Sequence, residues 1–289
     1  MDARISGHTK LYALIGSPVG HSGSPAMYNY SFAKTGVDAA YLAFDIPLEN
    51  VKEGVEALKA LHVGGFNVTM PDKTAAAGLV DAISPAAKLI GACNTVTVSA
   101  DGRLTGHNTD GIGFVQNLCE HAVEVSGKRL VVLGAGGAAT AICVQAALDG
   151  AREIAIFNRA DEFYANGEKT VEKLCAAVPS CKVSIHPLED ETALAAAVNS
   201  CELLVNATKV GMKPLDGQTL IDEKLLRKSL IVADTVYNPR KTLLIEQAEQ
   251  AGCTAIGGIG MLLWQGVAAF KLFTGKDMPA QEVLEKFFS

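Results

Sequence analysis

The sequence lacks the features that mark several classes of protein. It has no run of lysine or arginine, and its net charge of -6 argues against a nucleic acid or an acidic membrane surface as partner. The N-terminal stretch has no long apolar core of the kind that a signal peptide needs, so we expect a cytoplasmic protein. The most apolar late stretch, 259–273, is too short to span a membrane and carries Gln265 and Lys271.

Signs of metal or disulfide sites are also missing. The seven cysteines are widely scattered, odd in number and without a CxxC pair, and no two histidines show the spacing of metal ligands. We therefore expect reduced thiols in the core and no metal. What the chain does have is length and apolar content: 289 residues, 49% of them hydrophobic, are enough for about two domains with sizeable cores. A small molecule is the expected ligand.

The stretch 129–150 organises the rest of the chain. Apolar residues 130–133 run directly into a glycine-rich turn, and a helix-forming run follows. This pattern is typical of a dinucleotide site, in which backbone N–H groups at the start of a helix bind the pyrophosphate. Glycine-rich turns also occur for packing reasons, so the motif alone leaves both interpretations open. The expected cofactor-binding residues of the turn are Gly134, Ala135, Gly136, Gly137 and Ala138.

Strands and helices alternate on both sides of this turn, and the pattern predicts two α/β domains. Residues 1–109 and 259–289 are expected to form a substrate-binding catalytic domain with a mainly parallel sheet, including a hairpin at Asp101 and Gly102. The helical segment 75–90 precedes that hairpin. Residues 110–258 are expected to form a Rossmann-type, doubly wound domain that binds NAD(P). The last two helices are expected to return to the first domain.

Polar side chains follow the strands of the first domain, where a ligand can be held. They are Ser22, Ser24, Asn67, Thr69, Lys73, Asn94 and Asp110. Hydroxyls, amides, a lysine and a carboxylate suit a small polyhydroxylated acid, although each residue alone is equally typical of a turn or a helix cap.

Redox chemistry on an alcohol requires a group that takes up and returns the hydroxyl proton. Lys73 and Asp110 are the best candidates for it, and Asp110 is also expected at the N-cap of a helix. Gln265 interrupts an apolar helix, and its amide needs either a core partner or the ligand.

Eight ordered motifs together resemble the shikimate dehydrogenase family, in particular its quinate/shikimate dehydrogenase branch. They are GSPVGHSGSP, FNVTMPDK, GACNTV, HNTDG, GAGGAA, NATKVGM, VYNP and GMLLWQG, and they cover nearly the whole chain. The resemblance implies hydride transfer between NAD(P) and a ring hydroxyl of shikimate or quinate. It also implies that Lys73 exchanges the proton and that Asp110 assists.

The resemblance further implies which residues bind the substrate. Ser22, Ser24 and Tyr237 should hold the carboxylate region. Thr69, Asn94, Asp110 and Gln265 should hold ring hydroxyls, with Tyr41 joining them in the quinate-using branch. Val236 and Gly260 are expected near the cofactor.

Two departures from the biosynthetic branch concern the cofactor. Asn158 and Arg159 are followed by Asp161, a carboxylate that can accept from both ribose hydroxyls and would repel the 2′-phosphate of NADP. Arg159 can stack on adenine, so NAD is preferred and NADP is not excluded. Lys209 replaces the serine usual in the biosynthetic branch and is expected near the cofactor.

Two other functions remain as alternatives. One is a catalytically silent sensor of quinate or shikimate-pathway intermediates, against which the intact Lys73 and Asp110 argue. The other is an enzyme like the methylenetetrahydrofolate dehydrogenases, which also place a lysine-bearing domain before a dinucleotide domain. The sequence leaves open which acid is preferred and how many subunits associate, with a homodimer as the candidate assembly.

Overall fold

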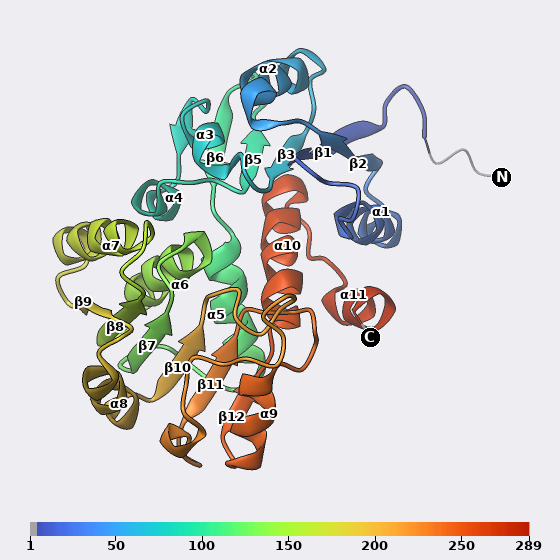
Figure 1. Ribbon diagram of the computed structural model, residues 1–289. Coiled ribbons are helices and arrows are strands. Elements are labelled where there is room, and N and C mark those ends of the chain that lie inside the picture. Colours follow the sequence, from blue (N-terminus) through green and yellow to red (C-terminus); the bar gives the residue numbers. More distant parts are fainter. Residues whose placement is uncertain (1–4, 289) are drawn as a thin grey trace. The chain divides into compact units, whose positions relative to one another are not determined.

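The computed structural model describes residues 5–288, and these divide into two compact α/β units. The first unit contains the described residues up to 109 and those from 263 onward, and the second contains residues 110–262 (Figure 1). The sequence had placed 259–262 with the first unit. These four residues begin helix α10 (Ile259–Thr274), which continues from the second unit into the first. Residues 1–4, part of the stretch from which the cytoplasmic location was predicted, lie outside the described residues.

The first unit is built on a six-stranded sheet with the strand order β2-β1-β3-β5-β6-β4. Its strands are β1 (Lys10–Gly16), β2 (Ala39–Asp45), β3 (Gly65–Val68), β4 (Ala82–Ile83), β5 (Thr95–Val98) and β6 (Leu104–His107). β1 pairs in parallel with β2 and β3, and β4 with β6, whereas β5 runs antiparallel to β3 and β6. The predicted hairpin is therefore confirmed. β4 was missed because it interrupts a segment that reads as helical.

The helices of this unit pack on both faces of the sheet. They are α1 (Ser24–Thr35), α2 (Val51–Ala60), α3 (Lys73–Ala77), α4 (Pro85–Ile90), α10 from residue 263 onward and α11 (Ala280–Phe287), with a 3₁₀ turn, η1 (Leu48–Asn50). Alternate residues of β1 point to opposite faces, as a strand requires. Tyr12 joins the cluster that includes Phe32 of α1 and Phe270 of α10, while Ile15 joins the cluster that includes Val55 of α2. Because both faces are covered, β1 reads as a continuous apolar run.

The second unit has a fully parallel sheet with the strand order β12-β11-β10-β7-β8-β9. Its strands are β7 (Arg129–Leu133), β8 (Glu153–Asn158), β9 (Lys182–Pro187), β10 (Leu203–Asn206), β11 (Ile231–Asp234) and β12 (Thr254–Ile256). Its helices are α5 (Asp110–Glu120), α6 (Gly137–Leu148), α7 (Tyr164–Ala177), α8 (Glu191–Ser200), α9 (Leu243–Gln250) and the start of α10, with a 3₁₀ turn, η2 (Glu223–Leu225). The strand order reverses between β7 and β10, which is the switch point of a Rossmann-type fold. The predicted fold class is confirmed.

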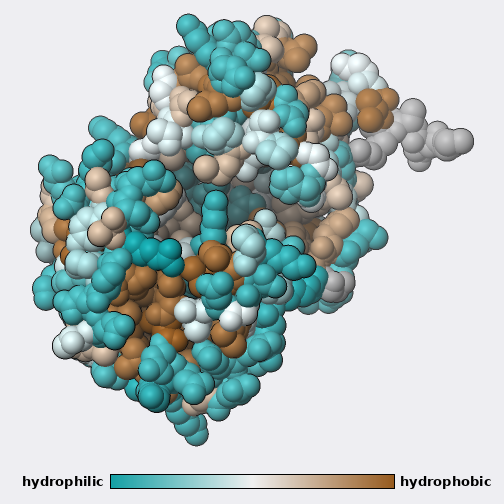
Figure 2. All heavy atoms as spheres, viewed as in Figure 1, coloured by the Kyte–Doolittle hydropathy of each residue, from teal (hydrophilic) through white to brown (hydrophobic). Residues whose placement is uncertain are grey.

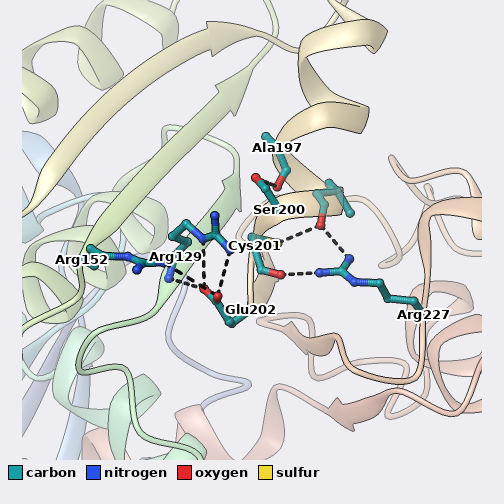
Figure 3. A network of polar contacts seen from close by, with 8 residues as sticks. Arg129, Arg152, Ala197, Ser200, Cys201, Glu202 and Arg227 are labelled. Carbon is teal, nitrogen blue, oxygen red and sulfur yellow. Dashed lines mark hydrogen bonds and ion pairs between the residues drawn. The ribbon is translucent and has the colours of Figure 1, made fainter.

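A network of charges joins the amino ends of the strands in this unit. Glu202, just before β10, accepts from the backbone N–H of Arg129 at 2.7 Å and from its guanidinium at 3.1 Å (Figure 3). Arg227 donates to the carbonyls of Val198 and Cys201 at the end of α8. Ligands bind at the opposite, carboxyl edge of such sheets, so this network has a structural role.

The surface of the molecule is mostly polar in the view of Figure 2, where an apolar patch in the lower half lies over the second unit. A hollow of about 430 Å³ between α8 and the sheet is lined there by residues that include Val131, Ala155 and Phe157.

Among the described residues, no helix combines the length and the apolar composition needed to cross a membrane. All seven cysteines are free, but Cys119 and Cys175 are exposed, so the expectation that all lie in the core was wrong for these two.

Candidate functional site

The carboxyl end of β3 and the amino end of β5 lie side by side, because the two strands are antiparallel with Asn67 opposite Thr95. The backbone N–H of Val68 donates to the carbonyl of Asn94 at 2.8 Å. Thr69, which follows β3, and Asn94, which precedes β5, therefore lie at the same edge of the first sheet. Sequence spacing could not show this, since 26 residues separate the two strand ends.

The loop that follows β1 reaches the same edge. The N–H of Thr69 donates to Ile15 at 2.9 Å, and that of Ser17 donates to Met70 at 3.3 Å. Ser22 and Ser24 belong to this loop and to the first turn of α1, and the hydroxyl of Ser22 accepts from the N–H of Ser24 at 3.2 Å. Both serines are partly exposed and can contact a ligand.

Lys73 is the first residue of α3, directly behind the β3 loop, and its side chain is half-buried. Its carbonyl accepts from the N–H of Cys93 at 3.0 Å, so the lysine backbone lies beside the segment that carries Asn94. Gln265 belongs to the same unit, on α10, where the hydroxyl of Tyr28 donates to the carbonyl of Gly266 at 3.2 Å. Seven predicted substrate-binding residues thus share the first unit: Ser22, Ser24, Tyr41, Thr69, Lys73, Asn94 and Gln265.

Asn94 is held by a residue that the sequence did not reveal, Thr109. The amide oxygen of Asn94 accepts from the N–H of Thr109 at 2.9 Å, and its nitrogen donates to the Thr109 hydroxyl at 2.9 Å. Asp110 follows immediately and is itself the first residue of α5, so it lies in the first helical turn rather than at the predicted N-cap. The available signal was the motif HNTDG, from which only Asp110 was named as a site residue.

Tyr41, expected near the substrate, is buried. Its side chain is 0% exposed, and its ring stacks on that of Tyr28 with centroids 4.3 Å apart. Its hydroxyl donates to the amide oxygen of Asn67 at 2.7 Å. Contact between Tyr41 and the ligand therefore stays a prediction, and the observed partners of its side chain are Tyr28 and Asn67.

In the second unit, the glycine-rich turn joins β7 to α6. Gly134 has φ of +106°, and a Cβ there would meet the carbonyl of Ala207 at 3.0 Å, so the fold itself requires glycine. At Gly136 and Gly137 the packing does not require glycine, because a Cβ would meet no atom within 4 Å among the described residues. No side chain caps α6, which begins at Gly137. Open space beside uncapped N–H groups fits the pyrophosphate of a dinucleotide.

The carboxyl end of β8 carries the residues expected near the adenosine ribose. Asn158 donates from its amide to Asp161 at 2.8 Å, and the same carboxylate oxygen, Oδ1, accepts from the N–H of Phe163 at 2.9 Å. Arg159 and Asp161 are both exposed. The turn thus already engages Oδ1 of Asp161 with two donors, and the expectation that this carboxylate accepts from both ribose hydroxyls stays a prediction.

The loops after β10 and β11 are fixed by a buried carboxylate, Asp234. It accepts from the amide of Asn206 at 2.9 Å, the N–H of Val236 at 2.9 Å and the hydroxyl of Thr242 at 2.6 Å. Burial raises the pKa of Asp234, and these three donors oppose the shift. The network orders the segments that carry the exposed side chains of Lys209 and Tyr237 and the buried Val236. Tyr237, predicted as a substrate ligand, belongs to this second unit.

Gly260 is explained by packing. A Cβ at this position would overlap the amide of Asn117 on α5, and the same amide donates to the carbonyl of Gly257 at 3.1 Å. The sequence analysis expected Gly260 near the cofactor, and its close neighbour in the structure is Asn117 of the protein's own α5. No group of three or more histidine, cysteine, aspartate or glutamate residues capable of holding a metal occurs within residues 5–288.

Comparisons with known proteins agree with this architecture. Residues 14–96 match the family model described as shikimate dehydrogenase substrate binding domain, and residues 258–286 match the shikimate 5'-dehydrogenase C-terminal domain. A shikimate dehydrogenase (NADP(+)) of Listeria monocytogenes serotype 4b is 49% identical over 286 residues, which cover 99% of this chain and 98% of that protein.

Two solved structures are informative. The shikimate 5-dehydrogenase of Listeria monocytogenes, in complex with shikimate and NAD, has a TM-score of 0.96 at 49% identity and covers 99% of this chain and 98% of its own. The quinate dehydrogenase of Corynebacterium glutamicum, in complex with NAD, has a TM-score of 0.87 at 29% identity, with coverage of 97% and 99%.

Proposed function

Because this chain belongs to the shikimate dehydrogenase family, we propose that it transfers a hydride between NAD(P) and a ring hydroxyl of shikimate, of quinate, or of both. The observation that carries the proposal is the match, over 99% of the chain, to the Listeria structure that holds shikimate and NAD. The sensor and the folate-type dehydrogenase gain no support, since the matching family models and curated relatives are shikimate dehydrogenases.

We propose the first unit as the substrate-binding catalytic domain. Its polar edge offers hydroxyls from Ser22, Ser24 and Thr69 and the amide of Asn94, which together suit the carboxylate and hydroxyls of the acid. Gln265 on α10 belongs to the same unit and completes the set proposed there. Tyr237, a residue of the second unit, remains a separate proposal as a substrate ligand. The proposed proton-exchanging group is Lys73: it takes the hydroxyl proton as the ring carbon loses hydride, and it returns a proton to the carbonyl oxygen in reduction. Asp110 is proposed to assist by orienting that hydroxyl.

We propose the second unit as the nucleotide-binding domain. When bound there, the nicotinamide supplies or accepts the hydride. The N–H groups from Gly136 to Ala138 are proposed to hold the pyrophosphate, and Asn158, Arg159 and Asp161 the adenosine. Lys209, Val236 and Gly260 remain proposals as neighbours of the cofactor. A cytoplasmic location and a homodimeric assembly are proposed as well, and sedimentation of the purified protein tests the latter.

We propose that NAD is preferred over NADP because Asp161 places a negative charge where the 2′-phosphate of NADP would lie. The test is Asp161→Asn, which keeps the Oδ1 acceptor for Asn158 and Phe163 and removes only the charge. We expect the ratio of kcat/KM for NADP to that for NAD to rise about tenfold, equivalent to about 1.4 kcal/mol. Glu162→Gln, an exposed neighbour, is the matched control. An unchanged ratio in Asp161→Asn would remove the charge argument.

The function itself is tested with the purified protein by a steady-state matrix of shikimate and quinate against NAD and NADP. We expect NADH formation with at least one acid. Absence of turnover in all four combinations would overturn the proposed activity.

A further inference from the structure

A chain of buried polar side chains crosses the first sheet from β2 to the start of α5. The hydroxyl of Tyr41 donates to Asn67 at 2.7 Å, Asn67 donates to the hydroxyl of Thr95 at 3.0 Å, and Thr95 donates to the amide oxygen of Asn94 at 2.9 Å. The N–H of Thr109 reaches the same oxygen from the other side at 2.9 Å. All five residues are between 0% and 7% exposed, so water does not compete for these bonds.

The direction of each bond is fixed by backbone groups whose roles are unambiguous. The amide nitrogen of Asn67 lies 3.2 Å from the backbone carbonyl of Asn94, which can only accept, so the amide oxygen of Asn67 faces Tyr41. The backbone N–H of Thr109 can only donate, so it is the oxygen of the Asn94 amide that it contacts. The amide orientations of both asparagines follow from these two contacts alone.

The Thr95 hydroxyl links the two amides. It accepts from the Asn67 nitrogen, so its single hydrogen is directed to Asn94. The amide oxygen of Asn94 then accepts from both Thr95 and Thr109, which fills its two lone pairs. The orientation of the Asn94 amide is therefore fixed: its oxygen faces Thr95 and the N–H of Thr109, and its nitrogen faces the Thr109 hydroxyl at 2.9 Å.

Tyr41 anchors the far end of the chain. Its ring stacks on Tyr28 with an interplanar angle of 5°, and its backbone N–H and carbonyl both bond to the side chain of Asn29. Burial raises the pKa of Tyr41 well above its ordinary value of 10.0, so the hydroxyl keeps its proton and remains a donor.

We propose that Tyr41 and Thr95 are positioning residues that, through Asn67, fix the orientation of the Asn94 amide at the hydroxy-acid site. This inference rests on the proposed function, because it assigns a ligand to Asn94. The proposal gives Tyr41 and Thr95 no direct contact with the ligand; they act through the amide of Asn94.

The test replaces the Thr95 hydroxyl while preserving its shape. Thr95→Val removes the donor to Asn94, and we expect the KM of the hydroxy acid to rise about fivefold, equivalent to about 1 kcal/mol, with the KM of NAD unchanged within a factor of about two. Thr95→Ser restores the hydroxyl and should restore the KM. Tyr41→Phe should raise the same KM by a smaller factor, because three hydrogen bonds in series separate Tyr41 from the Asn94 amide, against one for Thr95.

Thr97→Val is the matched control. It makes the same chemical change two residues along β5, where the hydroxyl lies 3.3 Å from His107 and outside the chain of bonds to Asn94. Melting temperatures of all variants separate a loss of stability from a loss of positioning, since a purely structural role would affect the KM of the acid and of NAD together.

Three results would overturn the inference: an unchanged acid KM in Thr95→Val, an equal rise in Thr97→Val, or no recovery in Thr95→Ser. Failure of the proposed function is distinguishable from these. In that case the wild-type protein turns over neither acid and, by calorimetric titration, does not bind shikimate, and the assignment of Asn94 falls with it.

Discussion

Two buried aspartates give a sharp test of how this fold tolerates charge. Asp72 and Asp234 are 0% and 2% exposed, and burial raises the pKa of both, with Glu49 adding to the shift at Asp72. Asp234 has three hydrogen-bond donors. Within residues 5–288, neither carboxylate oxygen of Asp72 has a hydrogen-bond donor. The same substitution, aspartate to asparagine, should therefore have opposite effects at the two positions.

The magnitudes follow from the cost of burying an unpaired polar group, which is about 1–3 kcal/mol and larger when the group is charged. Asp72→Asn removes the charge and should raise the free energy of unfolding at neutral pH by about 1–2 kcal/mol. For a protein of this size that corresponds to roughly 2–8 °C in melting temperature. Asp234→Asn turns an acceptor of three donors into a group with two donors of its own, and should lower the free energy of unfolding by about 2–4 kcal/mol.

The pH dependence of the stability difference distinguishes an effect of the Asp72 charge from an effect of side-chain shape. A carboxyl group whose pKa is raised in the folded state contributes stability that is fully present below its unfolded pKa, near 3.8, and is lost as the pH rises through the folded value. The advantage of Asp72→Asn over the wild type should therefore be small near pH 4 and grow towards neutral pH. Calorimetric melting between pH 4 and 8 measures it. A destabilised Asp72→Asn variant, or a gain that does not change with pH, would refute the reasoning.

Three further predictions concern the active residues and the second unit. Lys73→Met should lower kcat at least about 100-fold with little change in the KM of NAD, and an unchanged kcat in steady-state assays would reject Lys73 as the proton-exchanging group. Gly134→Ala should cost about 1–3 kcal/mol because of its positive φ, whereas Gly137→Ala should leave the melting temperature nearly unchanged but weaken NAD binding in a titration. The bonds from Arg129 outweigh burial and hold the pKa of Glu202 below its usual 4.5. The ionised Glu202 should contribute under about 1 kcal/mol to the free energy of unfolding above pH 4.5, and this contribution should be lost at lower pH. Glu202→Gln and the wild type should therefore differ in melting temperature at pH 7 and converge near pH 3.

Much of the fold could be predicted from sequence because local patterns determine it. The period of the apolar residues placed the strands of the second sheet, and the positive φ demanded at Gly134 follows from a tight turn between strand and helix. β4 was missed because two residues are too few to show a period. The antiparallel course of β5 was predicted because Asp101 and Gly102 mark a hairpin.

The candidate site was only partly predictable. Lys73, Asn94 and Asp110 could be named because polar groups after buried strands are unusual and because the motifs are specific. Tyr41 was expected at the ligand by resemblance alone, and only the structure shows that its side chain is buried and bonded to Asn67. Thr109 was not noticed at all, although it holds the amide of Asn94. An isolated threonine has no distinctive pattern, and only its partner across the fold reveals its role.

The sequence by itself determined the alternation of strands and helices, the dinucleotide turn and the family, since each depends on neighbours along the chain. The tertiary structure alone decided which polar groups meet. Tyr41, Asn67, Thr95 and Asn94 come from three strands and a loop, and a hydrogen bond needs its two atoms within about 3.5 Å. Packing across the sheet brings them that close, and the directions of the donors and acceptors then fix the orientation of the Asn94 amide.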